Sequence, residues 1–152
     1  MLPSEESIKR LKSNYPEGTR VKLLKMTDNY APPLGCFGTV VDVDDWGTIF
    51  VHWDNGSGLG LVYGEDACLP VTPEEEREAL QERLRGIVGQ VVFNHVSALE
   101  ALLNAYEQES EVTHLGNFIF EAAISNQKKL IIETEPMEDT ERKIKIIRVH
   151  MN

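Results

Sequence analysis

The residues of this chain whose types could do catalytic chemistry do not have the spacing that such chemistry needs. Ser57 stands in the string DNGSGLG, which superficially resembles a nucleophile elbow. That motif has the pattern G-x-S-x-G and leads into a helix, whereas Asn55 stands two positions before this serine and glycines follow it. No lysine follows closely to contact a phosphate. We therefore interpret the glycines as relief of crowding at a bend in a small sheet, and we predict that the chain is not an enzyme.

Residues that could bind a metal are also scattered. The histidines lie far apart, and no two of them have the four-residue spacing of a helical metal site: His52, His95, His114 and His150. Asp42, Asp44 and Asp45 lack the spacing and the distal glutamate of an EF-hand. Cys36 and Cys68 do not form a C-x-x-C pair, and we expect both to be free thiols. The sequence thus predicts neither a metal nor a cofactor.

The net charge of −10 is distributed unevenly along the chain. Ten acids and no lysine or arginine lie between Met26 and Glu76, and residues 86–127 add five acids, again without a base. The bases are confined to the first 25 residues, to residues 77–85 and to the tail after Lys128. Because a phosphate backbone is bound mainly by clustered lysine and arginine, the central part should repel nucleic acid and attract a basic protein. A surface that only keeps the protein soluble remains the alternative.

Residues 19–63 contain four β-like runs, which we place at residues 19–25, 37–44, 47–53 and 58–63. Period-two alternation predicts that these side chains face inward: Val21, Leu23, Val41, Val43, Ile49, Val51 and Trp53. The strings Asp-Trp-Gly and Asp-Asn-Gly suit tight turns, and the loop after the first run holds two prolines and should protrude. Short strands with one long first loop predict a small barrel of the SH3 type.

A series of short strings in residues 15–70 resembles a known family. They are YPEGTRVKLLKM from Tyr15, DNYAPPLG from Asp28, GTV from Gly38, VDD from Val43, TIFVHWDNG from Thr48, LGL from Leu59 and GED from Gly64. The family is a short domain of unknown function that recurs in proteins of bacterial phages, plasmids and conjugative elements. The resemblance implies an SH3-like barrel and an origin in a mobile element. It implies no reaction and no catalytic residues, because the family has none assigned.

Helices are predicted on both sides of the barrel. Residues 4–15 have Ser4 as N-cap and acids in the first turn. Thr72 and Pro73 begin a second helix that should end near Arg85. In the second half, residues 87–93 fit a strand, and a capping box at Ser97 to Glu100 begins a helix. Residues 113–125 fit both a strand and a helix, and we favour the helix. Residues 129–134 and 142–151 are β-branched runs around an acidic turn, which predicts a terminal hairpin.

The predicted fold class is therefore α+β, in three parts. Residues 1–70 form a helix plus an SH3-like barrel, residues 71–86 a connecting helix, and residues 87–152 a small α+β domain that ends in the hairpin. The last part has about 65 residues, near the lower limit for an independent core, so we expect it to pack on the barrel or on a second copy. No apolar run of about 18 residues exists to span a membrane, and we expect a protein of the bacterial cytoplasm.

The remaining candidate site is a binding surface on the barrel. We expect Trp53 in the core and Trp46 exposed at a turn, where a groove beside the long loop would gather Tyr30, Pro32 and Pro33 with it. An exposed tryptophan among carboxylates suits a partner that offers arginine or lysine. The predicted partner-binding residues are Asp28, Tyr30, Asp42, Asp44, Asp45, Trp46, Asp54, Glu65 and Asp66.

Three functions follow as hypotheses. The first is an acidic inhibitor of a mobile element, which mimics nucleic acid and occludes the basic channel of a host defence nuclease or a similar protein. The second is a nucleic-acid or nucleotide-binding accessory module that uses a basic stripe of the first helix and the terminal hairpin. Its residues would be Lys9, Arg10, Lys12, Arg20, Lys22, Lys143, Lys145 and Arg148. The third is a protein that sequesters a small ligand.

Overall fold

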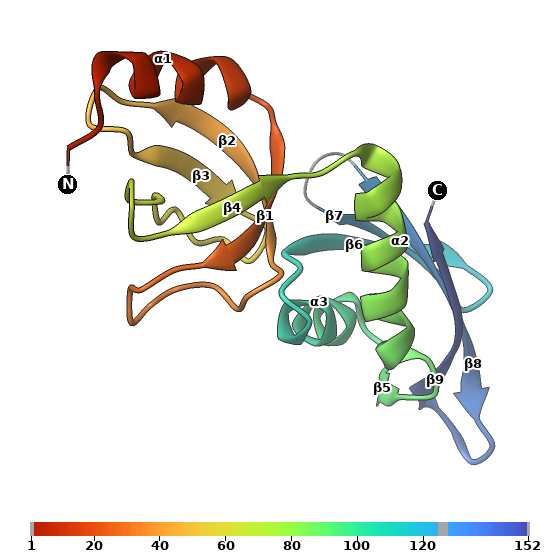
Figure 1. Ribbon diagram of the computed structural model, residues 1–152. Coiled ribbons are helices and arrows are strands. Elements are labelled where there is room, and N and C mark those ends of the chain that lie inside the picture. The colour runs from red at the N-terminus through yellow and green to blue at the C-terminus, as the bar shows by residue number, and fades with distance from the viewer. Residues whose placement is uncertain (1, 125–127, 152) are drawn as a thin grey trace. The chain divides into compact units, whose positions relative to one another are not determined.

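The structure of the protein is a computed structural model that describes residues 2–124 and 128–151. It has helices and strands of mixed order, which agrees with the predicted α+β class (Figure 1). The chain divides into two compact units, Met1–Pro73 and Glu74–Asn152, which we call unit 1 and unit 2. Among the described residues, no helix is long and apolar enough to cross a membrane.

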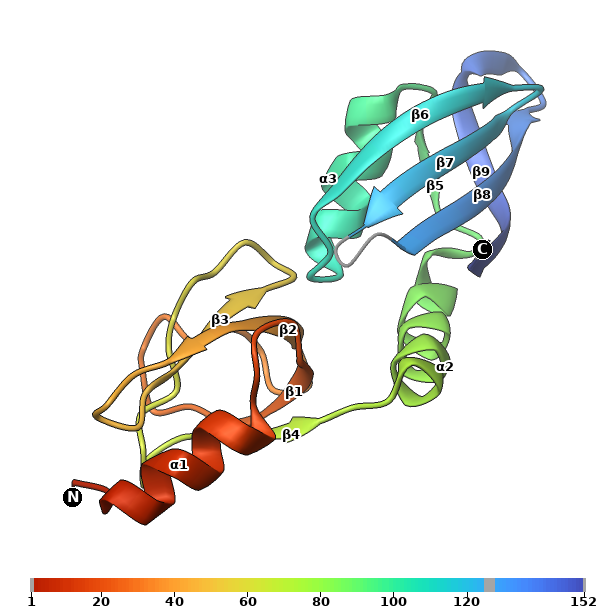
Figure 2. The same cartoon turned by 90° about the horizontal axis from the view of Figure 1, so that it is seen from above.

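Unit 1 consists of one helix and a curled antiparallel sheet in the order β3-β2-β1-β4 (Figure 2). Its elements are α1 (Glu5–Asn14), β1 (Arg20–Lys25), β2 (Phe37–Val43), β3 (Ile49–Trp53) and β4 (Ala67–Pro70). The first helix is confirmed, including its cap, because the Ser7 N–H donates to Ser4 Oγ at 3.2 Å. Leu11 and Tyr15, at the C-terminal end of this helix, pack against the core of the sheet.

The core of unit 1 is built from the inward faces of its strands. Trp53 is fully buried, as predicted, together with Val51. Gly38 pairs with Trp53 across β2 and β3, and a Cβ atom at this glycine would lie 2.5 Å from the Val51 side chain and 2.7 Å from the Trp53 ring. Only glycine therefore lets the two strands and the indole pack at this separation.

The predicted inward position of Val41 is wrong. The register of β2 against β3 shifts between Val40 and Asp42, which is the signature of a β-bulge. The extra residue turns Val41 outward, where it is 52% exposed, and Val40 faces the core in its place. Val43 faces the core as predicted.

The predicted fourth strand, residues 58–63, is also wrong. Leu61 alone forms a bridge to Ile49, with hydrogen bonds of 2.8 and 3.0 Å in the two directions. The carbonyl of Leu59 accepts from the Trp53 indole at 2.8 Å, and the N–H of Val62 donates to the Asp66 carboxylate. These side chains take the backbone groups that a strand would need, so the fourth strand forms later, as β4.

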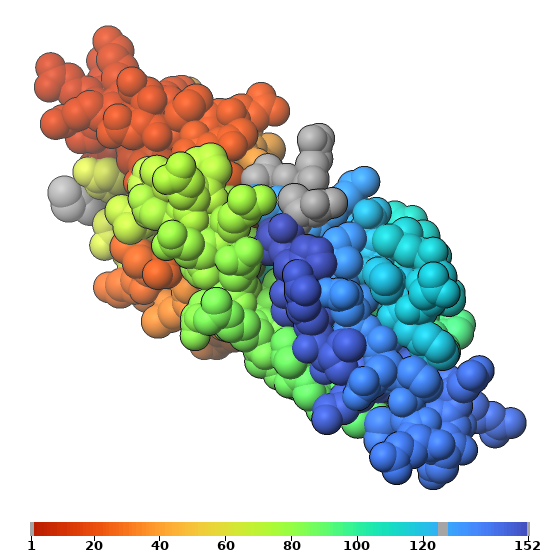
Figure 3. All heavy atoms as spheres, turned by 90° about the vertical axis from the view of Figure 1, so that its right-hand side faces the viewer, coloured from red at the N-terminus to blue at the C-terminus, as the bar shows by residue number. Residues whose placement is uncertain are grey.

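Unit 2 contains most of α2 and a five-stranded antiparallel sheet in the order β5-β9-β8-β7-β6. Its elements are α2 (Pro73–Leu84), the 3-10 turn η1 (Arg85–Ile87), β5 (Val91–Phe93), α3 (Val96–Ala105), β6 (Ser110–Gly116), β7 (Ile119–Ile124), β8 (Lys128–Met137) and β9 (Thr140–Met151). The terminal hairpin is confirmed and is longer than predicted, and its turn projects at the lower right of Figure 3. The predicted strand over residues 87–93 is reduced to its last three residues, because Ile87 ends the 3-10 turn and Gly89, with φ of 90°, is not in an extended conformation.

The helix favoured for residues 113–125 is wrong. The segment forms the end of β6 and the whole of β7, which pair as a hairpin. Asn117 and Phe118 form its turn with φ of 53° and 61°, and Phe120, Ala122 and Ile124 then alternate into the core. The period of two therefore outweighs the helical spacing in this segment. Ser125, the last residue of the predicted helix, lies outside the described residues.

The predicted capping box at Ser97 is replaced by a cap two residues earlier. His95 is the N-cap of α3, and its Nδ1 accepts from the Ser97 N–H at 3.0 Å. The Glu100 carboxylate accepts instead from the Val112 N–H of β6 at 3.2 Å. Glu100 thus joins the helix to the sheet rather than closing the first turn.

Candidate binding surface

The turn between β2 and β3 holds Trp46 outward. The Asp44 carboxylate accepts from the N–H groups of Trp46 and Thr48, each at 2.9 Å, and fixes the turn from within. Gly47 supplies the left-handed conformation that the turn requires, with φ of 83°. Trp46 is 66% exposed, as predicted from its place at a turn. The tryptophan is therefore presented on a well-defined turn, whereas Asp44 is occupied by the backbone.

The outer face of the β2–β3 hairpin adds apolar and acidic side chains to this turn. Asp42 is the cross-strand partner of Phe50, and both side chains are exposed. The bulge adds Val41 to the outward-facing residues of the same hairpin. His52 is also exposed on β3, farther from the turn. We call the exposed residues at and near the turn the β2–β3 surface: Val41, Asp42, Asp45, Trp46 and Phe50.

Asp45 at the tip of the turn forms an exposed ion pair with the first helix. The Lys12 ammonium lies 2.7 Å from Asp45 Oδ1. This hydrogen bond lowers the pKa of Asp45 and raises the pKa of Lys12, and Asp42 and Asp44 add to the rise. Asp42, Asp44 and Asp45 therefore all favour the charged form of Lys12.

Asp54 is not a surface residue, contrary to the prediction. Its carboxylate forms a two-point pair with Arg20, with distances of 2.9 Å from Nη1 to Oδ1 and 2.7 Å from Nη2 to Oδ2. The side chains are 8% and 2% exposed for Arg20 and Asp54, and Thr39 Oγ1 accepts another bond from Nη1 at 2.9 Å. This pair removes Asp54 from the predicted acidic surface and Arg20 from the predicted basic stripe.

The long loop between β1 and β2 does not meet Trp46. It joins the end of β1 to the start of β2, whereas the turn with Trp46 joins the end of β2 to the start of β3, so the two lie at opposite ends of β2. Tyr30 is highly exposed in this loop, where its N–H donates to the Asp28 carboxylate at 2.7 Å. Pro32 is buried and Pro33 is exposed. The predicted groove of Tyr30, the two prolines and Trp46 is therefore not formed.

Asp66 organises the segment before β4. Its carboxylate accepts from the Val62 N–H at 2.8 Å and from the N–H and hydroxyl of Thr27 at 3.0 and 3.3 Å. These bonds close the turn at residues 62–66 and hold it against the end of β1. Glu65, beside it, is exposed. Of these two predicted site residues, Asp66 is thus engaged by the fold and Glu65 faces the solvent.

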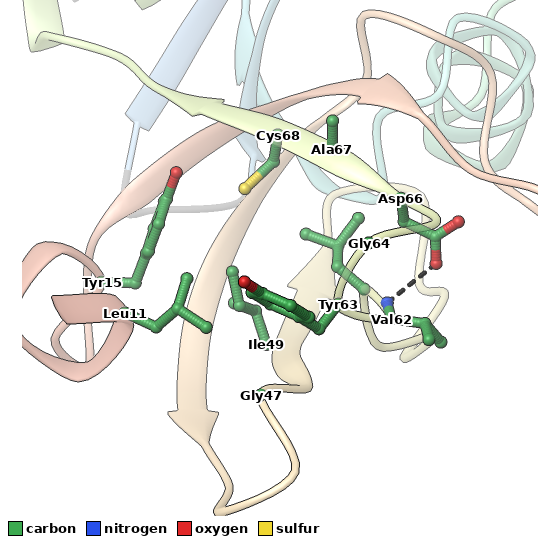
Figure 4. A pocket seen from close by; sticks show the side chains of 11 residues that line it. Leu11, Tyr15, Gly47, Ile49, Val62, Tyr63, Gly64, Asp66, Ala67 and Cys68 are labelled. Carbon is green, nitrogen blue, oxygen red and sulfur yellow. Dashed lines mark hydrogen bonds between the residues drawn. The ribbon is translucent and has the colours of Figure 1, made fainter. Parts of the chain in front are cut away.

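A pocket of about 260 Å³ lies between α1 and the sheet of unit 1 (Figure 4). Apolar side chains such as Leu11, Ile49 and Tyr63 line it, and Figure 4 places the Tyr15 hydroxyl and the Cys68 sulfur near each other at one side. Burial raises the pKa of Cys68 to about 11 and the pKa of Tyr15 to about 12. Both groups are uncharged at neutral pH, and a protonated thiol is a weak nucleophile. The pocket thus offers apolar contacts and a neutral hydroxyl.

The basic residues of the alternative hypothesis fall into two groups. On α1, Lys9 and Arg10 are exposed, and Lys12 is engaged by Asp45; on β1, Lys22 is half-buried. These residues belong to unit 1.

The second group lies on β9 in unit 2. Lys143 and Lys145 are exposed there, and Arg148 Nε lies 3.2 Å from the Glu133 carboxylate. A single stripe that joins both groups stays a prediction.

Both cysteines are free thiols, as expected. Within residues 2–124 and 128–151, no three or more histidine, cysteine, aspartate or glutamate side chains form a group that could hold a metal ion.

Comparison with protein families finds a match in the first half of the chain. Residues 4–71 match the model of a domain described as "Domain of unknown function (DUF4314)". The matched region begins at the cap of α1 and ends just after β4, so it includes all of the helix and the four strands of unit 1. No curated protein matches the chain, and no solved structure matches it.

Proposed function

We propose that the chain is a non-enzymatic binding protein whose unit 1 covers the basic, nucleic-acid-binding surface of another protein. The observation that carries this proposal is the β2–β3 surface, where a rigid turn presents Trp46 beside Asp45, and Asp42 faces Phe50 on the adjoining strands. An arginine side chain suits this surface, because its guanidinium can stack on an indole and donate to a carboxylate at the same time.

The charge of the chain supports the same role. The net charge of −10 attracts a basic partner over a distance and predicts fast association that weakens with salt. Because Asp44 and Asp54 are engaged within the fold, Asp42, Asp45 and the exposed aromatic side chains form the contact in this proposal. Lys12 competes with the partner for Asp45, so Asp42 and Trp46 contribute more to the binding energy.

The proposal includes the biological setting that the sequence resemblance implies. Unit 1 is an SH3-like barrel carried by a phage or another mobile element, and the chain acts in the cytoplasm of a bacterial host as an inhibitor of a defence nuclease or a similar protein. The curled four-stranded sheet with a long first loop supports this fold assignment. Occlusion of a nucleic-acid channel needs no catalytic group in the inhibitor.

The test is capture of a partner followed by competition. The tagged protein is incubated with nuclease-treated bacterial lysate, and each captured protein is purified and assayed for nucleic-acid binding with and without the chain. We expect a basic protein whose nucleic-acid binding is lost when the chain is added. The variant Asp42→Lys with Trp46→Ala should weaken capture by about tenfold or more, which corresponds to about 1.4 kcal/mol.

The matched control reverses charge elsewhere. Glu138→Lys changes one exposed acid in the β8–β9 turn of unit 2, which alters the net charge as much as Asp42→Lys does, and this variant should capture the partner as the natural chain does. If this control weakens capture equally, net charge alone drives the interaction and the β2–β3 surface has no special role. The capture is repeated with an untreated lysate. Recovery of nucleic acid from the untreated lysate, together with the loss of all capture from the treated one, would contradict the proposal in favour of direct nucleic-acid binding.

A further inference from the structure

Strand β5 is an edge of the five-stranded sheet of unit 2, with β9 as its neighbour on one side. The Ile146 N–H donates to the Gln90 carbonyl at 3.0 Å, and the Asn94 N–H donates to the Arg142 carbonyl at 2.8 Å. In an antiparallel pair, alternate residues direct their backbone groups to the neighbouring strand. The backbone groups of Val91 and Phe93 therefore point toward the open edge. The Phe93 carbonyl also accepts from the His95 N–H at 2.8 Å, and its second lone pair remains for another donor.

The side chains around this edge are apolar and exposed. Phe93 is 65% exposed and Val91 is 45% exposed, and by alternation both lie on one face of the sheet. Val92 points to the opposite face, which α3 covers in part. Exposed apolar side chains on an edge strand with open backbone groups are a template for pairing with another strand.

A groove of about 540 Å³ runs beside the edge, between β5 and α3. The helix contributes Ala98 and Ala101 to its wall, β5 contributes all three of its residues, and Lys143 of β9 also lines it. Because alanine has only a methyl group, α3 leaves space next to Val92 where a neighbouring strand would place its side chains. The groove thus has the position that the inward side chains of a sixth strand would take.

The face of this edge that carries Val91 and Phe93 is also basic. Lys143 and Lys145 of β9 are the cross-strand partners of Phe93 and Val91, and the Lys143 ammonium lies 5.8 Å from the centre of the Phe93 ring. Glu135 is the partner of Lys145 on β8, and neither lysine forms an ion pair within the described part of the chain. A strand added here would place the side chains of one face beside Val91 and Phe93, one strand away from the two lysines, in a protein whose net charge is −10.

We propose that the β5 edge binds an extended peptide segment of a partner protein, which adds a sixth strand to the sheet. The segment alternates apolar and acidic residues. Its apolar side chains enter the groove over Ala98 and Ala101, and its acidic side chains lie beside Val91 and Phe93 within reach of Lys143 and Lys145. A second copy of the chain fits this edge less well, because antiparallel pairing of β5 with itself would bring the lysines of both copies together.

The test uses a fluorescein-labelled peptide with the sequence Glu-Val-Glu-Ile-Glu-Val-Glu and the full-length protein. Binding is followed by fluorescence anisotropy. A peptide of the same composition with its valines and isoleucine grouped together, and one with lysine in place of glutamate, serve as controls. We expect saturable binding of the alternating acidic peptide and at least about tenfold weaker binding of both controls. No saturable binding of the alternating peptide would overturn the proposal.

Variants of the protein locate the site. Val91→Pro removes an outward N–H while the bonds of Gln90 and Asn94 to β9 remain, and Ala101→Phe fills the groove from an exposed helix position. Each should weaken binding of the alternating acidic peptide by at least about tenfold, whereas Ala105→Phe, on the same helix but outside the groove, should leave binding unchanged. Lys143→Glu should lower the affinity for the acidic peptide and raise the affinity for the lysine peptide. Unchanged affinity in both Val91→Pro and Ala101→Phe would overturn the proposal.

Two further measurements keep the test independent of protein stability and of self-association. A peptide with N-methyl groups on all of its residues has no N–H group to donate to the edge, and it should fail to bind the natural chain even if Val91→Pro does not fold. Light scattering over a range of protein concentrations reports the oligomeric state. A dimer that Val91→Pro converts to a monomer would overturn the peptide proposal in favour of a second copy at this edge.

Discussion

Two turns of unit 1 contain the same pair of residue types and place them in opposite environments. One follows β2 with the order Asp45, Trp46, and the other begins at the last residue of β3 with the order Trp53, Asp54. The first tryptophan is 66% exposed and the second is fully buried. Residue type alone therefore does not show which side chains of this acidic segment are free to bind a partner. The position of each turn relative to the core decides which of them are exposed.

The physical difference lies in what each carboxylate contacts. Asp54 comes directly after the inward-facing Trp53, and its N–H donates to the Phe37 carbonyl at 2.9 Å. This bond holds Asp54 in a buried position beside the start of β2. There it binds Arg20 through two hydrogen bonds. Asp45 stands at the tip of a turn and binds Lys12 in solvent. The first acid holds strands together, whereas the second is available to a partner.

The largest expected effect separates the two ion pairs. Asp54→Ala leaves the Arg20 guanidinium buried without its carboxylate, which should lower the free energy of unfolding by about 3–5 kcal/mol. Asp45→Ala should leave this free energy almost unchanged, because the pair is exposed and solvent screens it. Urea unfolding of both variants, followed by circular dichroism, measures the difference. Equal effects would show that the two turns are not distinct in the way that burial indicates.

The packing of Trp53 gives the second prediction. Gly38→Ala would insert a methyl group against Val51 and Trp53, and overpacking of this kind should cost about 1–3 kcal/mol of unfolding free energy. Gly58→Ala is the matched control, because a Cβ atom there has no other atom within 4 Å. The same urea experiment applies. A tolerated Gly38→Ala together with a damaging Gly58→Ala would contradict the packing around Trp53.

The third prediction concerns the thiol of Cys68, which lines the pocket beneath α1. Cys68 has a pKa of about 11 in the folded protein, against 9.0 for an ordinary thiol, so its protonated form favours folding. This contribution is complete below pH 9 and is lost as the pH rises toward 11. Alkylation by iodoacetamide in a Cys36→Ala background should show a midpoint near pH 11 when folded and near pH 9 in urea. Coincident midpoints would show that Cys68 is exposed.

The smallest expected effect concerns the exposed pair of Lys12 and Asp45. Because Lys12 lowers the pKa of Asp45 below 3.8, the stabilisation by the pair is present above this pH and is lost as the pH falls through the folded value. The raised pKa of Lys12 sets the upper limit, so stabilisation is complete below pH 10.5 and is lost above it. Lys12→Ala should thus lower the thermal midpoint slightly at neutral pH and not in strong acid. High salt should remove the difference. A difference that persists in acid would mean that the Lys12 side chain acts through packing.

The sequence predicted well those features that depend on local pattern. The cap and length of α1, the inward alternation of Ile49, Val51 and Trp53, and the terminal hairpin follow from spacing and turn residues, and all are confirmed. The exposure of Trp46 follows from its position beside Gly47.

The features that it missed depend on contacts between distant residues. A bulge adds one residue to β2, so strict alternation placed Val41 on the wrong face. The Asp-Asn-Gly turn predicts an exposed Asp54, and only the fold reveals Arg20 opposite it. One signal was present: Asp54 directly follows an inward run that ends in Trp53, where a carboxylate needs a partner. The β5 edge had no signal, because its neighbour lies far along the chain.

The strand orders of the two sheets have a consequence for the order of events during synthesis. All pairings of unit 1 lie within residues 20–70, so its sheet can form as soon as that part of the chain has left the ribosome. In unit 2, β5 waits for residues 143–145 before it has a neighbour. At about 5–20 residues per second, the exposed strand remains unpaired for several seconds. Unit 1 therefore folds first, and the apolar β5 segment waits longest among the strands for its first neighbour.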